Sequence, residues 1–128
     1  SDERIKQDIR DSNSQWDDIK AVKVRNFKKK DDVRQYGDKA WEQIGVIAQE
    51  LEAAGMDKLI KHGDPSAADI ISSSEFGTLN EDGTIKEIKT QVKKVGYSVL
   101  YMKAIKALQE AMAKIETLEA DVKTLKGE

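Results

Sequence analysis

The first six residues, SDERIK, hold a serine and a lysine, two side chains that can serve together as nucleophile and general base. A serine hydroxyl is a weak nucleophile until a base takes its proton, and a lysine is such a base only when burial or a neighbouring cation holds it neutral. Attack by Ser1 on the carbonyl just before it forms an ester by an N-to-O shift, which water then hydrolyses. This chemistry requires no external substrate.

The spacing of Ser1 and Lys6 restricts how they can meet. Five residues of an α-helix turn through about 500°, which places the two side chains on different faces. Either Ser1 lies on an extended segment ahead of a helix, or the lysine comes from another subunit. Each also has an ordinary interpretation, Ser1 as a helix N-cap and Lys6 as a surface lysine. We interpret Asp2 and Arg4 as a structural surface ion pair rather than as catalytic supports.

Composition limits the possible functions of the chain. Its 128 residues suffice for one domain with a modest core, and charged residues make up 36% while aromatic residues make up 5%. This balance indicates an extended or oligomeric molecule. The net charge of −2 gives no general attraction to nucleic acid or to acidic membranes, and no apolar run is long enough to span a bilayer. Without cysteine, disulfides, thiolate zinc sites and a cysteine nucleophile are excluded.

Hydrophobic spacing gives the elements that must position the amino-terminal residues. Ile5 and Ile9 lie four residues apart and predict a short helix within residues 2–16. Ser12 or Ser14 is the expected N-cap of the next helix.

A mixed body follows this segment. Alternation at Val22 and Val24 predicts a strand that leads into a polar turn. A second strand is expected at residues 43–47, and a helix at residues 48–54, ended by Gly55. The KHGDPSAAD stretch indicates a loop. Short β-prone segments on either side of residues 80–83 predict a protruding hairpin.

The last third of the chain carries a heptad repeat. Apolar residues recur at alternating intervals of three and four, at Tyr101, Ala104, Leu108, Ala111, Ile115, Leu118, Val122 and Leu125. We call these residues the seam. They predict one helix of about 30 residues, or about 45 Å, that packs against copies of itself. The alternative is an amphipathic helix folded back on the body, for which Ile105 and Met112 leave room.

Other candidate residues favour structural interpretations. His62 has no second ligand at metal spacing, so we expect a loop histidine and no metal site. Lys28 to Lys30 precede two aspartates and indicate a solvated turn. Gln49 and Glu50 either line a cleavage region or begin a helix. No P-loop pattern is present, and we expect no cofactor.

Three blocks, in order, resemble the C-terminal intramolecular chaperone domain of phage tail fibres, tailspikes and neck appendages, a self-cleaving endosialidase-type peptidase family. They are SDERIK, the G-x-I-A-Q-E block within QIGVIAQELE, and the Y-S-x-L…A-I-x-x-L-x-E block that leads into the seam. The resemblance covers essentially the whole chain, but residues 55–90 depart from the pattern. It implies a homotrimer that folds an upstream β-rich fibre or appendage domain of the same precursor and then cuts itself off before Ser1.

The resemblance also implies a Ser-Lys dyad, with Ser1 as nucleophile and Lys6 as its base in a single-turnover serine endopeptidase. We therefore expect that a chain beginning at Ser1 is the released chaperone, present in the host cytoplasm during virion assembly and absent from the mature virion. Its partners are expected to be itself and the upstream domain, with no nucleic acid and no membrane. The alternative is a non-catalytic trimerisation module.

We thus predict an α+β fold in one domain, residues 1–128. It comprises a small mixed body with a hairpin, residues 1–96, and a long helix, residues 97–128, that forms a homotrimeric coiled coil. Ile115 and Val122 at a with Leu118 at d would alone favour a parallel dimer. We predict a trimer, as the resemblance implies, because alanines weaken the upper seam and contacts between the bodies can set the number of subunits.

Overall fold

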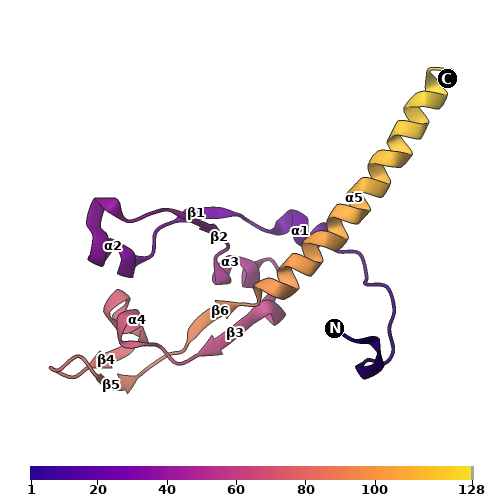
Figure 1. Cartoon of the computed structure of the whole chain (residues 1–128). Helices are drawn as coiled ribbons and strands as arrows, with labels where there is room; N and C mark the ends of the chain where they lie inside the picture. The colour runs from indigo at the N-terminus through magenta and orange to yellow at the C-terminus, as the bar shows by residue number, and fades with distance from the viewer. Residues whose placement is uncertain (128) are drawn as a thin grey trace.

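The computed structural model describes residues 1–127 and has mixed helix and sheet, with one long carboxy-terminal helix standing away from the rest (Figure 1). Five α-helices are present in this part of the chain, at α1 (Trp16–Ala21), α2 (Lys30–Tyr36), α3 (Ala48–Ala53), α4 (Ala67–Ser72) and α5 (Tyr97–Leu125). Single 3-10 turns lie at Glu3–Ile5, Gly37–Lys39, Asp57–Leu59 and Ser74–Phe76. The α+β prediction is confirmed.

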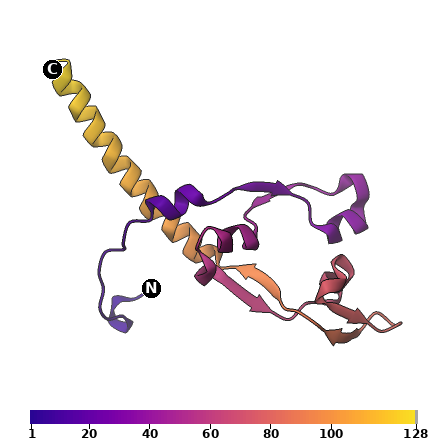
Figure 2. The ribbon, with the colours of Figure 1, turned by 180° about the vertical axis from the view of Figure 1, so that it is seen from behind.

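The strands form three separate antiparallel pairs. They are β1 (Arg25–Phe27), β2 (Gln43–Gly45), β3 (Ile60–Gly63), β4 (Gly77–Leu79), β5 (Ile85–Ile88) and β6 (Val92–Val95), paired as β1 with β2, β3 with β6, and β4 with β5. The first pair carries α2 at its end, and the other two pairs lie one after the other with α4 beside them. The body therefore has two arms that leave the base of α5 on the same side (Figures 1 and 2).

The arms touch at their far ends through α2 and α4. The Arg34 guanidinium donates to the carbonyl oxygen of Ala68 at 3.2 Å and to the Ser72 hydroxyl at 3.0 Å, and Lys30 donates to the carbonyl oxygen of Ser72 at 3.4 Å. Ser66 caps α4 through a complete capping box with Asp69.

A small core holds the arms to the first turns of α5. Its buried members are Leu51, Met56, Leu59, Ile60 and Leu100. Because this cluster is small, much apolar surface elsewhere stays exposed. No helix within residues 1–127 is both long and apolar enough to cross a membrane.

Several local predictions are confirmed. The second predicted strand is β2, the helix that follows is α3 with Gly55 at φ +85°, and the hairpin is β4 and β5 with Gly83 at φ +86° in its turn. α5 has the predicted position and length.

The predicted helix within residues 2–16 is wrong. Asp2 caps a single 3-10 turn that ends at Lys6, and the chain then runs without regular structure to α1. Ile5 and Ile9 are 80% and 70% exposed, so the helical spacing has no surface to pack against. Ser12 and Ser14 are not the N-cap of α1 either, because that position is Gln15, which makes no capping bond.

Two further predictions of irregular structure are wrong, because the segments contain helix or strand. The polar turn expected after β1 is partly α2, which begins at Lys30. The loop expected at residues 61–69 contains most of β3 and the start of α4.

Candidate functional site

Ser1 and Lys6 lie at the two ends of one short turn. The turn Glu3–Ile5 separates them, with Ser1 ahead of its Asp2 cap and Lys6 as the extended residue directly after it, at φ −122° and ψ 150°. Both residues are exposed, and within residues 1–127 no side-chain hydrogen bond reaches either of them. Asp2, the residue after Ser1, is extended ahead of the turn, and no hydrogen bond joins the Ser1 and Lys6 side chains within the chain.

Asp2 and Arg4 hold the turn together. The Asp2 carboxylate accepts from the Arg4 backbone N–H at 2.9 Å and pairs with the Arg4 guanidinium at 2.6 Å. The side-chain hydrogen bonds from Arg4, followed by the bond from its backbone, hold the pKa of Asp2 below its ordinary value. This pair is the surface ion pair expected from the sequence, and it sets the backbone between Ser1 and Lys6.

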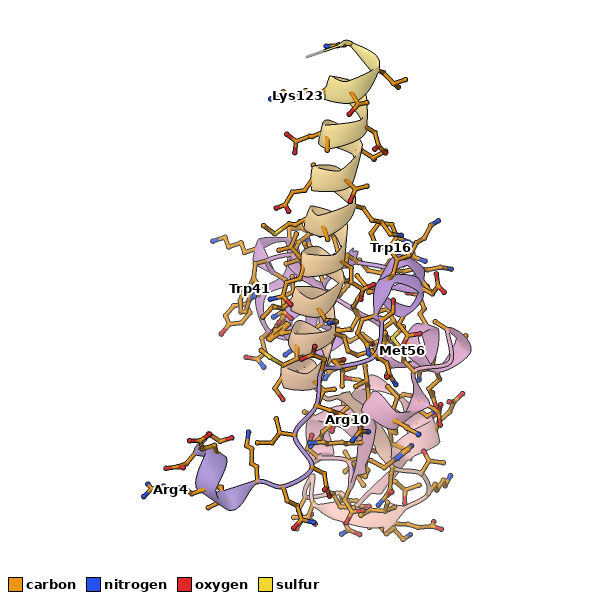
Figure 3. The ribbon with its side chains drawn as sticks, turned by 90° about the vertical axis from the view of Figure 1, so that its right-hand side faces the viewer. Arg4, Arg10, Trp16, Trp41, Met56 and Lys123 are labelled. Atoms are coloured by element: carbon orange, nitrogen blue, oxygen red, sulfur yellow. The ribbon has the colours of Figure 1, made fainter. Side chains whose placement is uncertain are left out.

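The amino-terminal segment, residues 1–13, is free of the body, and we call it the strap. Figure 3 shows Arg4 at its far end, well away from α5, and Trp16 beside that helix. The chain reaches α5 directly after the carboxy-terminal end of the strap, at Ser14 and Gln15. The Ser14 hydroxyl donates to Glu110 at 2.6 Å, and the Gln15 backbone N–H donates to the same carboxylate at 2.7 Å.

Glu110 is therefore the anchor of the strap. The hydrogen bond from the Ser14 hydroxyl, with the bond from the Gln15 backbone, lowers the pKa of the Glu110 carboxyl. Sequence reasoning gave Glu110 no role, although it is the glutamate that ends the Y-S-x-L…A-I-x-x-L-x-E block. A separation of 95 residues hides such a contact from local patterns.

α1 is fixed to α5 on both sides of this anchor. Lys103 donates to Asp18 at 2.8 Å, and the Lys114 ammonium lies 3.7 Å from the centre of the Trp16 ring. These contacts join the end of the strap to the middle of α5.

The second sequence block packs against the start of the third. Gly45 lies so close to Tyr97 that a Cβ added there would be 3.0 Å from the tyrosine hydroxyl oxygen. The Val46 backbone N–H donates to that oxygen at 3.4 Å. The glycine of G-x-I-A-Q-E thus lets β2 approach the first turn of α5.

Glu50 of the same block has a structural partner. Its carboxylate receives two hydrogen bonds from the Arg25 guanidinium, at 3.0 and 2.6 Å, and these bonds lower its pKa. The pair joins β1 to α3. Gln49 is exposed on the same helix.

The remaining candidates show no binding cluster. His62 lies on β3 and is exposed, and no group of three or more potential metal ligands occurs within residues 1–127. Lys28 and Lys29 precede α2, while Lys30 is its first residue.

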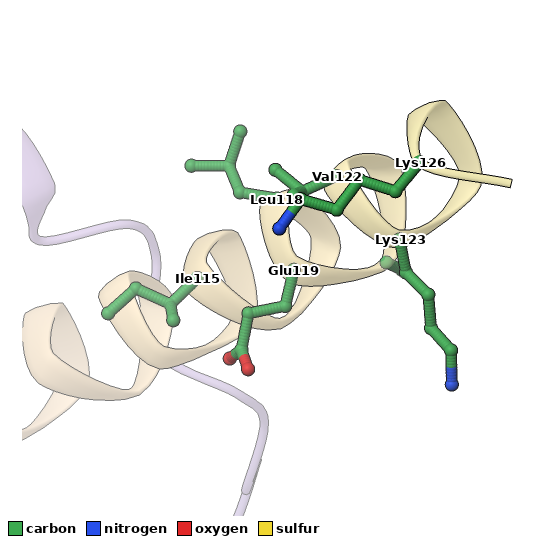
Figure 4. Close-up of a pocket in the computed structure, with 7 residues that line it drawn as sticks. Ile115, Leu118, Glu119, Val122, Lys123 and Lys126 are labelled. Carbon is green, nitrogen blue, oxygen red and sulfur yellow. The ribbon is translucent and has the colours of Figure 1, made fainter. Parts of the chain in front are cut away.

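The seam lies open along α5. The body packs on Leu100 and Ala107, which are buried, whereas Leu108, Ile115 and Leu118 are 60%, 54% and 62% exposed. A shallow groove beyond the body is lined by seam residues with charged residues beside them, and Figure 4 shows Ile115, Leu118 and Val122 in it. The body therefore packs along one flank of the seam and leaves Leu108, Ile115 and Leu118 exposed.

Comparisons with known proteins agree with the fold and the motifs. Residues 1–63 match the Peptidase_S74 family, described as chaperone of endosialidase. A solved structure described as a novel intramolecular chaperon aligns with a TM-score of 0.61 and 21% identity, over 89% of this chain and 99% of that chain. This likeness shows a shared fold. No curated protein matches the chain.

Proposed function

We propose, from the match of residues 1–63 to the chaperone-of-endosialidase family, that this chain is an intramolecular chaperone that assembles its precursor and frees itself by cutting the bond before Ser1. The observation that carries the cleavage proposal is the capped turn Glu3–Ile5. It leaves Ser1 exposed ahead of the extended Asp2, with Lys6 immediately after the turn.

The proposed reaction uses only groups of the chain and water. Lys6 Nζ takes the proton of the Ser1 hydroxyl as Oγ attacks the preceding carbonyl carbon. The C–N bond then breaks, the Ser1 nitrogen leaves as the amine with a proton from Lys6, and an ester joins the upstream chain to Oγ. Water hydrolyses this ester, which gives an upstream carboxylate and restores the serine hydroxyl.

Assembly is the proposed trigger for the reaction. Lys6 serves as a base only in its neutral form, and burial against another subunit favours that form by removing water from the ammonium group. Because the strap has no partner on its own body, a neighbouring subunit is the surface that can bury it. Cleavage then follows correct assembly.

We propose a homotrimer built on the seam. Leu118, Val122 and their seam neighbours are exposed in the single chain, so their burial favours association. Ile105 and Met112, which are exposed in the single chain, widen the apolar stripe beside the seam. Three helices cover the wider stripe, which supports the trimer over the dimer.

The biological setting belongs to the same proposal. Residues 1–128 act as one chaperone domain, with residues 1–96 as its body and residues 97–128 as its long helix. The partner is an upstream β-rich fibre or appendage domain of the same precursor, folded in the host cytoplasm during virion assembly. The released chaperone is then absent from the mature virion.

A non-catalytic trimerisation module is the second candidate. It is favoured by the exposure of Ser1 and Lys6 and by the absence of a hydrogen bond between them within residues 1–127. Removing the candidate nucleophile distinguishes the two functions.

The test uses a precursor that carries the natural upstream residues. Ser1→Ala removes the nucleophile and should stop cleavage while leaving assembly intact. Lys6→Arg keeps the positive charge but offers no group that deprotonates near neutral pH, so it should also stop cleavage. Ser12→Ala and Lys28→Arg, both in exposed segments, are the matched controls and should be cleaved normally. Normal processing of Ser1→Ala or Lys6→Arg would refute the role assigned to that residue.

A further inference from the structure

We infer that a groove between α1 and α5 receives Met112 of a neighbouring copy, and that Ile105 of that copy enters the adjoining hollow lined by Ile19, Leu100 and Ala104, in a parallel and in-register assembly. This inference rests on the proposed trimerisation and deepens it. The groove, which we call the α1–α5 groove, is lined by Trp16, Ile19, Lys20, Ala104, Ala107, Leu108 and Ala111.

The body occupies one flank of the seam and leaves the other flank open. With Tyr101 at heptad position a, the residues that face the body are Leu100, Ala107 and Lys114 at g, and Lys103 and Glu110 at c. Positions c and g lie side by side on one flank of a heptad helix, and position e lies on the other. The groove is therefore on the g flank.

The open e flank carries apolar residues next to the body. Ile105 and Met112 occupy e positions and are 46% and 51% exposed. In a parallel coiled coil a g residue faces the e residue five positions later in the neighbouring helix. Leu100 then faces Ile105 of the next copy, and Ala107 faces Met112. Both apolar e residues thus reach a flank where α1 has added apolar walls.

Charge complementarity continues this pairing beyond the body. The next two g residues are Lys114 and Asp121, and the e residues five positions later are Glu119 and Lys126. Lys114 therefore faces Glu119 of the next copy, and Asp121 faces Lys126, so each pair joins opposite charges.

The charges also select the register. A slip of one heptad in one direction puts Lys114 opposite Lys126, and a slip in the other puts Asp121 opposite Glu119. Like charges at such short range are unfavourable in both cases. Of these three parallel registers, only the in-register one pairs opposite charges at both g positions and both e positions.

The arrangement joins assembly to the strap. Trp16 is a wall of the α1–α5 groove, and the Lys114 ammonium lies over its ring at 3.7 Å. A neighbour seated in the groove holds α1 against α5. The strap ends at residue 13, just before α1, and the adjoining Ser14 donates to Glu110, so the same contact fixes the base of the strap.

The experiment follows Trp16 and assembly together. Trp41→Phe leaves Trp16 as the one tryptophan of the 128-residue chain. Sedimentation equilibrium gives the concentration of half-assembly, and acrylamide quenching reports exposure of the Trp16 ring in assembled and diluted protein. We expect quenching to fall on assembly. Met112→Lys should raise the half-assembly concentration at least about tenfold, because it places a charge in an apolar groove.

The matched control for this change is Met102→Lys. Met102 is 62% exposed and occupies a b position, outside the groove and the seam. It should leave the half-assembly concentration within about twofold of the parent, since surface substitutions of this kind cost little.

Charge reversal tests register separately. Asp121→Lys and Lys126→Asp should each raise the half-assembly concentration about two- to fivefold, and the double variant should recover the parent value. Assembly with unchanged Trp16 quenching and an unaffected Met112→Lys variant would overturn the groove while leaving trimerisation intact. Failure of the double variant to recover would overturn the register. A chain that stays monomeric yet is cleaved normally would contradict the proposed trimerisation and the inference with it.

Discussion

Replacing four seam residues by glutamine should abolish both assembly and self-cleavage. The residues are Leu108, Ile115, Leu118 and Val122, which are 60%, 54%, 62% and 46% exposed in the single chain. Glutamine is a good helix former, so α5 should persist. The change removes the apolar surface that association would bury.

The magnitude follows from this exposure. Fully burying such a side chain stabilises by about 1.5 to 3 kcal/mol, so about half of that at four positions gives about 5 kcal/mol per chain and about 15 kcal/mol per trimer. This is of the same order as the roughly 4 to 15 kcal/mol that association costs in lost freedom. Without the four apolar side chains, we expect a monomer at micromolar concentration.

The assay combines sedimentation velocity with the kinetics of precursor cleavage. The control carries four glutamines on the opposite face of the same helix segment, at Ala113, Glu116, Ala120 and Lys123, which leaves the net charge unchanged. This control should assemble and be cleaved normally. A monomeric seam variant that cleaves itself at the normal rate would show that the site is complete within one chain, and that assembly does not control it.

Three further predictions concern residues 1–128 as an isolated chain. The lowered pKa of Glu110 means that the hydrogen bond from the Gln15 N–H to its carboxylate is intact above the ordinary carboxyl pKa of about 4.3 and is lost as the pH falls through the folded-state pKa. The chemical shift of the Gln15 amide in NMR spectra should follow this titration, and Glu110→Gln should abolish the pH dependence of that shift. Gly77→Ala should break the β4–β5 pairing, because the new Cβ would lie 2.1 Å from the carbonyl oxygen of Glu87, and hydrogen exchange should show faster exchange throughout the hairpin; protection equal to that of the parent would contradict this reasoning. Leu51→Ala should lower the free energy of unfolding by about 2 to 5 kcal/mol in urea titrations, since Leu51 is 2% exposed, and a loss below 1 kcal/mol would mean that the core cluster does not support the body.

Local patterns predicted the elements whose signal is contained in a few neighbouring residues. The unbroken heptad repeat gave α5, and Asp82-Gly83 between β-prone segments gave the β4–β5 hairpin. The apolar block before Gly55 gave β2 and α3. In each case the residues at the turn or helix end and the spacing of the apolar residues predict the same element.

The errors arose where tertiary contacts decide the structure. Ile5 and Ile9 have helical spacing, but the strap has no surface to bury them, and the cap at Asp2 supports only one turn. α2 and α4 are short, and they stabilise each other through Arg34 and Ser72, a contact between segments 38 residues apart. Such mutual support leaves no periodic signal in either segment.

The candidate site was predictable in its residue types more than in its surroundings. The resemblance of SDERIK to the family motif gave Ser1 and Lys6 as the candidates, which stay a prediction, and the structure adds the capped turn between them. The anchor of the strap at Glu110 and the groove beside Trp16 depend on long-range packing, which no short stretch of sequence contains.

The most direct test of self-cleavage is the intact mass of the products when the gene is expressed with its natural upstream residues. Self-cleavage predicts that the wild-type precursor, synthesised in a cell-free system without added proteases, yields two fragments. The smaller fragment should begin at Ser1. Self-cleavage also predicts one full-length chain from the Ser1→Ala variant made in the same way. A single intact wild-type chain, after assembly has been verified by sedimentation, would contradict the account.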